Sequence, residues 1–565
     1  VDNLFGNMRS VSRHAGGVVV AENLDHHMPL INSGGVIQTP WSEGQNVRHL
    51  EPLGFIKFDL LGLSTLRMIS GAIRHILKRA HGIEEPTFEQ VRDYYNTNLH
   101  PDTIDFDNQE VWREVFHKGK WAGIFQMTNG GAQRFCQEAQ PESLLDFAAV
   151  TAIFRPGPLS AKAHSLYVAN KSNPSQVHYE HPIIKEVLGD TYGLLVFQEQ
   201  LAMLAHKLGD NLSLDEGNLL RKVLTKKGTG KDSVKTKLYN KFVKGCNSHG
   251  LSEEVAKNLW AKMEFFSGYG FNLSHAVSYG AVSFQCAWLS YYYPVEWMAA
   301  FLDKEPEDRK AQAINTAKSF GFDIVPPSIN KSGRVWEIAE DGKTLIQPLA
   351  GIKGLGDSAI DQIVVNRPFN SIEEFLFNEN ITYSKLNKKA LDVLVRSKAL
   401  DELMDDRFTG LKHYWSAVAV DRPRKEKNLL DNIDLYAPEG DFSEEEKIEH
   451  FASLTGIFPI HEIMPQEIQD NLMNRGCPPI SEYDPDLKLV WFIPREVKVK
   501  KTKNGKEYWI IHTTDSNSHD ARIRCWGVKD NDRISLNKVY VANLEHNEKW
   551  GFSTRSIKRS FRRLT

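Results

Sequence analysis

Cysteine is scarce in this chain: the 565 residues include five, and no two of them form a C-x-x-C pair. Their spacing excludes a zinc ribbon and gives no disulfide framework, so we expect reduced thiols in a cytosolic protein. Long apolar runs are also scarce. The stretch from Ala276 to Tyr293 carries no charge, yet it contains serines, a glutamine and three consecutive tyrosines. It predicts a buried helix rather than a membrane span, and neither a signal peptide nor an internal repeat is visible.

The composition is that of a large globular protein. Apolar residues make up 41% of the chain and charged residues 25%, which is ordinary for soluble folded domains. A chain of this length has material for several hydrophobic cores. It begins with Val1 rather than with methionine, so we expect a fragment or a processed product.

Positive and negative charge are segregated along the chain, although the net charge is only −3. Residues 221–244 contain nine basic residues and one acid, whereas residues 431–449 contain eight acids and one lysine. Basic residues dominate again in 495–506 and in 555–563. Basic patches separated by an acidic linker predict a protein that lays several modules along a polyanion. Solvated helix faces would explain any one patch, but they explain the alternation less well.

Local patterns divide the chain into four regions. Residues 1–65 contain short β-branched runs punctuated by glycine, and residues 66–325 have mostly helical periodicity. Residues 326–480 combine a glycine-rich turn with short helices. From residue 486 to residue 565 the pattern is strand-like, and Asn504-Gly505 between two alternating runs predicts a hairpin. The expected fold class is therefore multidomain α+β, largely helical.

One short strand-like run, Lys57-Phe58-Asp59, carries the most informative chemistry. Because alternate residues of a strand share a face, Lys57 and Asp59 point one way, and Ile56 and Phe58 are expected to point into a core. The carboxylate can then hold a metal ion while the lysine faces phosphates bound to that metal, a pairing suited to phosphoryl transfer. Taken alone, a lysine and an aspartate on a strand are more often a surface ion pair.

The same run lies within a longer ordered pattern. Arg13-His14 leads into Gly16-Gly17 and a β-branched run, and Leu60-Leu61-Gly62-Leu63 leads from Asp59 into a helical pattern. This set resembles the palm segment of family C replicative DNA polymerases, the alpha subunits of bacterial DNA polymerase III. The resemblance implies that residues 1–65 are the end of a thumb and the last segment of a nucleotidyltransferase palm. It also implies that Asp59 is the third catalytic carboxylate and a ligand of Mg²⁺.

Five further motifs resemble the fingers of that family, in its order and at roughly its spacing. They are Gly123-Ile124-Phe125-Gln126, Arg155-Pro156-Gly157-Pro158-Leu159, Thr191 to Gln200, Leu220-Arg221-Lys222 with Lys226-Lys227, and Gly268 to His275. The resemblance implies that residues 66–325 form a helical fingers domain. The residues expected to contact the triphosphate or the primer-template backbone are Lys57, Arg155, Arg221, Lys222, Lys226, Tyr269 and His275.

The residue types suit that role. Arg155 precedes a rigid Pro-Gly-Pro, which allows its guanidinium to be presented as a fork. The basic residues that begin at Arg221 have one-turn spacing and can line one face of a helix, where they would neutralise charge on the leaving pyrophosphate. Tyr269 lies between glycines and can press on a nascent base pair, although a tight turn with a core tyrosine explains it as well. One departure is Leu273, where the family usually has lysine; a basic contact is lost.

Residues 351–360 carry a helix-hairpin-helix signature, Gly-Ile-Lys-Gly-Leu-Gly followed by a helical run. Its glycines let the backbone approach a phosphate, and the N–H groups that start the next helix supply donors. We expect Gly351, Lys353, Gly354 and Gly356 to bind duplex DNA without reading its sequence. Residues 326–480 are accordingly a helix-hairpin-helix and clamp-binding domain followed by the acidic linker.

The clamp-binding hypothesis rests on Asn432-Ile433-Asp434-Leu435-Tyr436, which resembles a relaxed form of the family's sliding-clamp pentapeptide. The family prefers glutamine first and phenylalanine last, and a plain amphipathic linker explains these residues nearly as well. Residues 486–565 resemble an OB-type β-barrel. Single-stranded DNA would then contact Lys501, Lys503 and Trp509, with Tyr508 and Trp526 as further stacking candidates, unless these aromatics simply fill the barrel.

Two more catalytic aspartates are implied by the resemblance. Asp105 and Asp107 imitate the family's P-D-x-D-x-D-F signature, but they follow the Lys57-Phe58-Asp59 run instead of preceding it, so we reject them. The economical interpretation is that the first two aspartates, most of the thumb and a PHP domain lie on sequence outside this chain.

The sequence thus predicts the C-terminal part of a replicative DNA-directed DNA polymerase, which adds dNTPs to a primer 3′-OH with two Mg²⁺ ions in the complete enzyme. The expected partners are primer-template DNA, single-stranded template, dNTPs, an N-terminal polymerase segment, a sliding clamp and other replisome subunits, without a membrane. The expected location is the cytoplasm of a bacterial or phage-infected bacterial cell. The alternative is a non-catalytic DNA-binding scaffold or clamp adaptor of a replisome.

Overall fold

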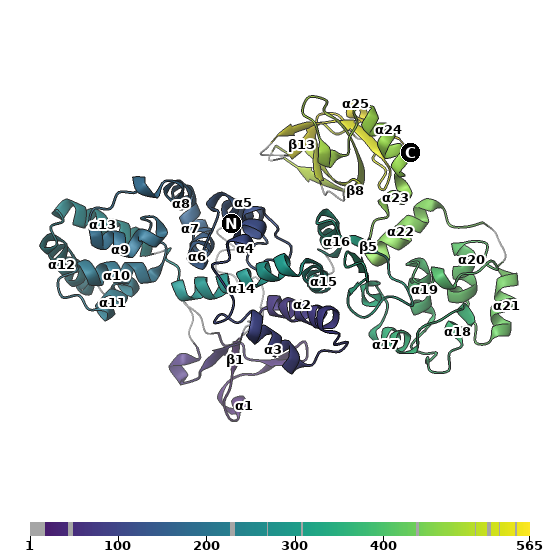
Figure 1. Ribbon diagram of the computed structural model, residues 1–565, viewed down its shortest axis with the longest axis horizontal. Coiled ribbons are helices and arrows are strands. Elements are labelled where there is room, and N and C mark those ends of the chain that lie inside the picture. The colour runs from purple at the N-terminus through teal and green to yellow at the C-terminus, as the bar shows by residue number, and fades with distance from the viewer. Residues whose placement is uncertain are drawn as a thin grey trace. The chain divides into compact units, whose positions relative to one another are not determined.

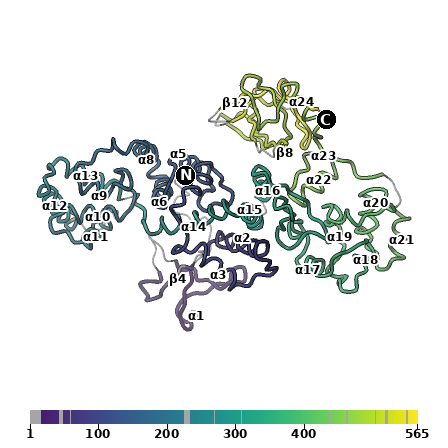
Figure 2. Tube along the Cα trace, in the orientation of Figure 1, coloured from purple at the N-terminus to yellow at the C-terminus, as the bar shows by residue number. Residues whose placement is uncertain are grey.

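The structure is a computed structural model that describes residues 17–42, 49–60, 62–225, 232–267, 269–306, 309–436, 440–502, 504–516, 521–529, 531–547 and 551–564. The chain divides into two compact units, Val1–Arg67 and Met68–Thr565. Helices dominate most of the second unit, and strands gather near its C-terminal end (Figure 1; the same trace is drawn as a tube in Figure 2). The predicted fold class, multidomain α+β and largely helical, is confirmed.

The first unit contains two antiparallel ribbons. Its elements are β1 (Gly17–Val19), α1 (Leu24–His27), β2 (Ile31–Ser33), β3 (Val36–Gln38), the 3-10 turn η2 (Glu51–Leu53) and β4 (Lys57–Asp59). β2 pairs with β3, and β1 pairs with β4 so that Gly17 lies opposite Asp59 and Val19 opposite Lys57. The ribbon thus joins the glycine-valine run to the Lys57-Phe58-Asp59 run, two segments that are about forty residues apart in the chain.

The expectation that Ile56 and Phe58 point into a core is wrong. Their side chains are 65% and 47% exposed, and Val20 and Leu60 are exposed as well. The physical reason is that a two-stranded ribbon has two open faces. Within the described residues of this unit, no helix or second sheet buries either face.

The helices of the second unit begin with α2, which starts in the first unit. They are α2 (Ser64–His81), α3 (Phe88–Asn98), α4 (Gln109–Val111) with the π-turn η3 (Trp112–His117), α5 (Gly130–Ala139), α6 (Leu144–Ile153), α7 (Pro156–Ser160), α8 (Ala163–Ser172), α9 (Pro182–Leu188), α10 (Gln198–Leu208), α11 (Leu214–Thr225), α12 (Asp232–Ser248), α13 (Glu253–Ser267), α14 (Leu273–Tyr292), α15 (Pro294–Lys304) and α16 (Lys310–Ser319). These helices confirm the helical periodicity of residues 66–325.

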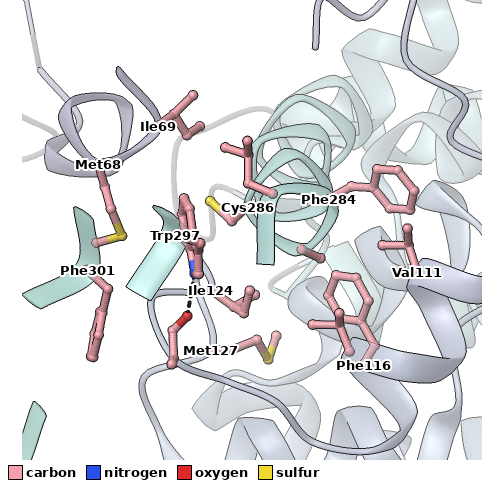
Figure 3. Packing of buried hydrophobic residues seen from close by; sticks show 14 of the residues in the cluster. Met68, Ile69, Val111, Phe116, Ile124, Met127, Phe284, Cys286, Trp297 and Phe301 are labelled. Atoms are coloured by element: carbon pink, nitrogen blue, oxygen red, sulfur yellow. Dashed lines mark hydrogen bonds between the residues drawn. The ribbon is translucent and has the colours of Figure 1, made fainter. Parts of the chain in front are cut away.

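Two hydrophobic cores hold these helices together. The larger core surrounds α14, the predicted uncharged helix, whose Phe284 and Cys286 are fully buried among side chains from α2, η3, α6 and α15 (Figure 3). Trp297 of α15 is also fully buried and donates its indole N–H to the Ala122 carbonyl at 2.8 Å. The smaller core is built from side chains of the five consecutive helices α9, α10, α11, α12 and α13. Among the described residues, none of the helices is long and apolar enough to cross a membrane.

The next region begins with a three-stranded sheet in the order β5 (Asp323–Val325), β7 (Thr344–Ile346), β6 (Glu337–Ile338). The helical elements that follow are η7 (Leu349–Gly351), α17 (Asp357–Asn366), α18 (Ile372–Leu376), α19 (Lys388–Arg396), η8 (Asp401–Leu403), α20 (Leu411–Trp415) with the π-turn η9 (Ser416–Val420), α21 (Glu426–Leu435), α22 (Glu444–Thr455), α23 (Ile460–Ile463) and α24 (Gln466–Asn474). Most of them share one separate core, from Ile329 to Leu454.

The acidic stretch 431–449, expected to be a linker, is partly helical in its described residues. It contributes to α21 and α22, and the two helices bury Leu429, Asn432 and Ile448. The acids occupy the exposed sides of these helices, and three glutamates form the first turn of α22, where the helix dipole favours negative charge. Amphipathic packing therefore outweighs the charge repulsion that would extend the segment.

The C-terminal strands form a curled seven-stranded sheet. They are β8 (Leu489–Lys501), β9 (Glu507–Thr514), β10 (Ala521–Cys525), β11 (Tyr540–Asn543), β12 (Glu545–Asn547), β13 (Gly551–Thr554) and β14 (Phe561–Arg563). β8 and β9 form the predicted hairpin, with Gly505 at φ +76° in its turn. β10 pairs in parallel with β13, and β13 pairs in antiparallel orientation with β12. On its other side, β8 pairs in antiparallel orientation with β11. Only Leu544 separates β11 from β12, which lie in the two halves of this strand order. The OB-type barrel itself stays a prediction.

Candidate functional site

Arg155 is the centre of a cluster of side chains from separate motifs. It precedes α7, its Nε donates to the Ala152 carbonyl at 2.9 Å, and its Nη2 donates to the Tyr269 carbonyl. Its guanidinium also lies over the Phe271 ring, 4.5 Å from the centroid. Burial lowers the pKa of Arg155. The planar fork is therefore held in place by two carbonyls and one ring.

Gln198 joins this group to the basic helix α11. Its backbone N–H donates to the Phe271 carbonyl at 2.8 Å, and its Nε2 donates to the Gly270 carbonyl at 3.0 Å. Its Oε1 accepts a hydrogen bond from Arg221. Arg221 is half-buried against this partner, whereas the neighbouring Lys222 is exposed. The two adjacent cations therefore differ in environment: one is bonded within the protein, and the other faces solvent.

Glu199 fixes the start of α14. Its two carboxylate oxygens accept from the Asn272 side chain at 2.8 Å and from the Leu273 N–H at 2.9 Å. Asn272 in turn caps the helix by accepting from the His275 N–H at 2.8 Å. Leu273 packs against the large core. The acid of the previous motif therefore determines where α14 begins.

His275 stands at this helix start in a column of rings. Its ring lies 5.4 Å from that of Phe271 and 4.1 Å from that of Tyr279, and the Tyr279 ring lies 5.2 Å from that of Phe125. His275 itself is exposed. Four of the five fingers motifs thus meet around Arg155 and His275, and Phe125 of the fifth closes the end of the column. We call the residues Arg155, Gln198, Glu199, Arg221, Phe271, Asn272 and His275 the fingers cluster.

Tyr269 is fixed by the turn that follows Arg155. Its ring lies against Gly157, where an added Cβ would lie only 2.0 Å from a ring carbon. The tyrosine is half-buried and also contacts the Phe265 ring at 5.4 Å. The glycine of the Pro-Gly-Pro turn is therefore required by the close approach of this ring.

The helix-hairpin-helix signature forms a tight turn before α17. Gly354 has φ +94°, which only glycine adopts without strain, and Gly356 precedes the first residue of α17. Lys353, Gly354 and Gly356 are exposed, as a phosphate-binding turn requires. Gly351 is buried, and an added Cβ there would lie 3.0 Å from the side-chain nitrogen of Gln347.

The curled C-terminal sheet presents a basic, aromatic surface on one side of β8, β9 and β10. Register places Lys500 opposite Tyr508, and His512 opposite Arg522. The Tyr508 and Trp526 rings stack at 4.6 Å, and Trp526 is 40% exposed. We call this surface the outer barrel face, defined by Lys498, Lys500, Tyr508, Arg522, Arg524 and Trp526.

Two residues expected to bind DNA on the barrel have other surroundings. Trp509 lies opposite the buried Cys525 and packs against the barrel core, because alternate residues of β9 face inward. Lys501 forms an ion pair with Glu507 at 3.4 Å. Trp526 is exposed and the half-buried Tyr508 stacks on it, on the side of the sheet opposite to Trp509.

The clamp-like residues 432–436 lie at the end of α21. The Asn432 side chain is buried and donates to the Ala417 carbonyl at 2.9 Å, and the Ile433 carbonyl contacts His413 Nε2 at 2.9 Å. Leu435 is 70% exposed. In this structure the five residues are therefore not an exposed, extended peptide.

Comparison with known proteins places this geometry in a family. The model of the bacterial DNA polymerase III alpha subunit finger domain matches residues 77–250, and a helix-hairpin-helix motif matches residues 321–409. The DNA polymerase III subunit alpha of Aquifex aeolicus is 31% identical over 91% of this chain and 42% of its own length. That of Campylobacter jejuni is 33% identical over 71% of this chain and 32% of its own length.

The chain belongs to the family of bacterial DNA polymerase III alpha subunits. It spans less than half the length of the curated relatives it matches; for the Pseudomonas aeruginosa protein, 31% identical, the share is 35%. Of the expected triphosphate ligands, Arg155, Arg221, Tyr269 and His275 lie in or beside the fingers cluster, and Lys222 is exposed on α11. Lys226, Lys503 and the side chain of Asp59 lie outside the described residues, and Lys57 belongs to the first unit.

Four members of this cluster were not predicted from the sequence. Gln198, Glu199, Phe271 and Asn272 all lie in the fingers motifs, yet no role was expected for any of them. The only available signal was a glutamine-glutamate pair directly before a helical run, which predicts a helix start but not its distant partner. Their contacts cross more than seventy residues of chain, from Gln198 and Glu199 to the start of α14.

Replacing Gly157 by alanine is expected to displace the Tyr269 ring, because a Cβ at 2.0 Å cannot be accommodated. We expect a local loss of about 1–3 kcal/mol, read as faster hydrogen exchange in residues 152–161. The control is Gly189→Ala, since Gly189 has helical backbone angles and nothing within 4 Å of the added Cβ. Equal exchange rates in the wild type and in Gly157→Ala would refute the required approach.

Replacing Glu199 by alanine is expected to loosen the first turn of α14, because it removes both acceptors for Asn272 and Leu273. The expected cost is about 1–2 kcal/mol of local stability. Hydrogen exchange of residues 271–279 measures it, and Glu138→Ala on an exposed site of α5 is the control. If both variants exchange alike, Glu199 does not hold the helix start.

Proposed function

We propose that this chain is the part of a replicative DNA-directed DNA polymerase that binds the incoming nucleotide and holds the DNA. The observation that carries the proposal is the convergence of four fingers motifs on Arg155 and His275. The cluster combines two guanidinium groups and an exposed imidazole, which are groups that bind a triphosphate. Homologues named DNA polymerase III subunit alpha support the same activity.

Each part of the fingers cluster has a definite task in this proposal. Arg155 and Arg221 would contact the triphosphate and stabilise charge that develops on the leaving pyrophosphate. Glu199 and Gln198 would hold the α14 start and Arg221 in place, so that little reorganisation accompanies binding. Tyr269 would lie along the nascent base pair. Lys222 of α11 and Lys226, which follows α11 in the sequence, would contact the phosphates.

Two Mg²⁺ ions are implied by the family, but the described residues do not by themselves fit them. Among those residues, no group of three or more histidine, cysteine, aspartate or glutamate side chains could hold a metal ion. Asp59 supplies one carboxylate, whereas each Mg²⁺ takes about six oxygen ligands. In the complete enzyme Asp59 would be one of three aspartates, with Lys57 beside it facing phosphate.

A further polypeptide segment would supply the other two aspartates. The exposed Ile56, Phe58 and Leu60 support this part of the proposal, because exposed apolar side chains that lie close together favour a protein partner. A polymerase segment that adds to the β1–β4 ribbon would bury them and complete a palm. Without that segment we expect the chain to bind primed DNA but not to extend it.

The helix-hairpin-helix turn and the outer barrel face would hold DNA away from the reaction centre. Lys353, Gly354 and Gly356 would contact duplex phosphates, and the outer barrel face would take single-stranded template by stacking on Tyr508 and Trp526. The sliding clamp would bind Leu435 and Tyr436, which requires the end of α21 to leave its present packing around Asn432. Other replisome subunits would use the remaining surface.

The nucleotide-binding step is tested by titrating the chain, on a primed template, with a fluorescent dNTP. We expect saturable binding that the Arg155→Ala and Arg221→Ala variants each weaken at least about tenfold. The control is Arg92→Ala on the exposed side of α3. Absence of saturable dNTP binding would favour a DNA-binding scaffold without a nucleotide site, and binding that the Arg155 and Arg221 variants leave unchanged would refute the proposed position of the site.

The single-strand site is tested on the outer barrel face. Replacing Arg522 and Arg524 by alanine is expected to reduce the slope of log affinity against log salt by about 1–1.5, since each phosphate contact contributes about 0.7. Tyr508→Ala is expected to cost about 1–3 kcal/mol of binding free energy. Fluorescence anisotropy with oligo-dT measures both quantities. An unchanged salt slope would move the site elsewhere.

A further inference from the structure

A cavity lies next to Arg155 of the fingers cluster, between the two hydrophobic cores of the helical region. Its volume is about 350 Å³. One wall comes from the larger core, through Ile153 and Val196, and the other from the smaller core, through Ile184, Leu188 and Leu259. Arg155 and Tyr269 form part of the lining. The cavity is thus a space that neither core fills.

The floor of the cavity is apolar and well shielded from solvent. Ile153, Val196, Ile184, Leu188 and Leu259 are each at most 5% exposed. An apolar cavity of this kind offers water no hydrogen-bond partners, so it favours an apolar occupant. Its volume lies in the range of sites that hold small organic molecules.

The mouth of the cavity is polar and contains one basic and one acidic side chain. It is lined by His178, Glu180 and Lys262, which are exposed, and by Phe265, which is 61% exposed. Lys262 lies 3.6 Å from Glu180, a separation typical of a loose, solvent-screened ion pair. The lysine can therefore turn to an anion that enters the mouth. Phe265 offers an aromatic edge beside it.

We propose that this cavity binds a small aromatic molecule with an apolar body and one anionic group, the body on the floor and the anion at Lys262. The site is distinct from the proposed triphosphate site, because the cluster residues meet it only through Arg155 and the adjoining Tyr269. An occupant packs against the far side of the turn that carries Arg155. The proposal does not depend on polymerase activity, and its test contains no nucleotide.

The test is ligand-observed ¹⁹F NMR with the full 565-residue chain and two probes. These are 4′-fluorobiphenyl-4-carboxylate, which has the proposed chemistry, and 4-fluorobiphenyl, which lacks the charge. We expect saturable binding of the carboxylate at one site per chain and weaker binding of the neutral probe. Absence of saturable carboxylate binding, or equal affinity for the two probes, would overturn the proposal.

Variants at the mouth locate the site. Ala161→Trp is expected to obstruct the cavity and weaken carboxylate binding at least tenfold, and Lys262→Gln is expected to abolish the preference for the charged probe. Their controls are Phe88→Trp, at an exposed phenylalanine of α3, and Lys257→Gln, on the same helix as Lys262 but outside the cavity lining. Neither control is expected to change binding.

Hydrogen exchange gives a second, independent location. The bound carboxylate is expected to slow exchange in residues 152–166, 178–196 and 259–267, which contribute to the cavity lining, and to leave residues 388–396 of α19 unchanged. Binding that is insensitive to Ala161→Trp, or protection that falls outside these three segments, would assign the probe to another surface and refute the proposed site.

Discussion

Replacing Asp59 by asparagine is expected to reduce template-directed dNTP incorporation on the order of 10³-fold in the complete polymerase, that is, this chain joined to a family member's segment with the other two aspartates. Asparagine keeps the size of the side chain and removes its charge, so the loss reports the carboxylate and not the packing of β4. Rapid-quench measurement of single-nucleotide incorporation gives the rate.

The chain provides a matched control for that measurement. Asp105 and Asp107 imitate the family's paired aspartates, but both are exposed, and they lie in a turn before α4 where the Asp107 N–H donates to the Asp105 carboxylate at 3.0 Å. Their asparagine variants are expected to incorporate nucleotide at close to the wild-type rate, as exposed substitutions usually do. An active Asp59→Asn enzyme, or an inactive Asp105→Asn enzyme, would contradict the assignment.

Replacing Arg155 by lysine is expected to lower kcat/KM for the correct dNTP by about 10²-fold, nearly as much as replacing it by alanine. Lysine keeps the charge, but it cannot donate to Ala152 and Tyr269 at once while lying flat on Phe271. A point charge without the planar fork would leave both Tyr269 and the phosphate contact misplaced.

Steady-state incorporation kinetics of the same complete polymerase measure this effect, with Arg92→Lys on α3 as the control. The positioning role also predicts that Arg155→Lys raises hydrogen exchange in residues 268–275, whereas Arg92→Lys does not. If Arg155→Lys retained wild-type kcat/KM, the arginine would act as charge alone and the geometry described for the fingers cluster would be incidental.

Local elements were well predicted from the sequence where periodicity and turn residues agreed. The hairpin at Asn504-Gly505 and the buried helix α14 both follow from such local rules. For residues 431–449 the acidic charge did not predict the helices α21 and α22. Charge alone does not reveal that Leu429 and Ile448 of these helices are buried. The strand Lys57–Asp59 was also predicted, but burial of its apolar residues depends on a packed partner and not on alternation.

The site was less predictable than the elements that carry it. Arg155, Arg221, Tyr269 and His275 could be selected by residue type and by the resemblance to a family. Their mutual placement depends on Gln198 and Glu199, whose partners lie far away in the chain. On the barrel, a choice between Tyr508 and Trp509 needs the inward or outward register of β9, which the hairpin turn alone did not give.

The most direct test of the whole account is single-nucleotide extension of a primed DNA template with Mg²⁺ and the four dNTPs, compared between two samples. One sample contains the 565-residue chain alone, and the other contains the chain joined to the palm segment of a family member. We expect both to bind the primed template and only the second to extend it, with the base dictated by the template. Extension by the chain alone, or no extension by the joined polypeptide, would contradict the account.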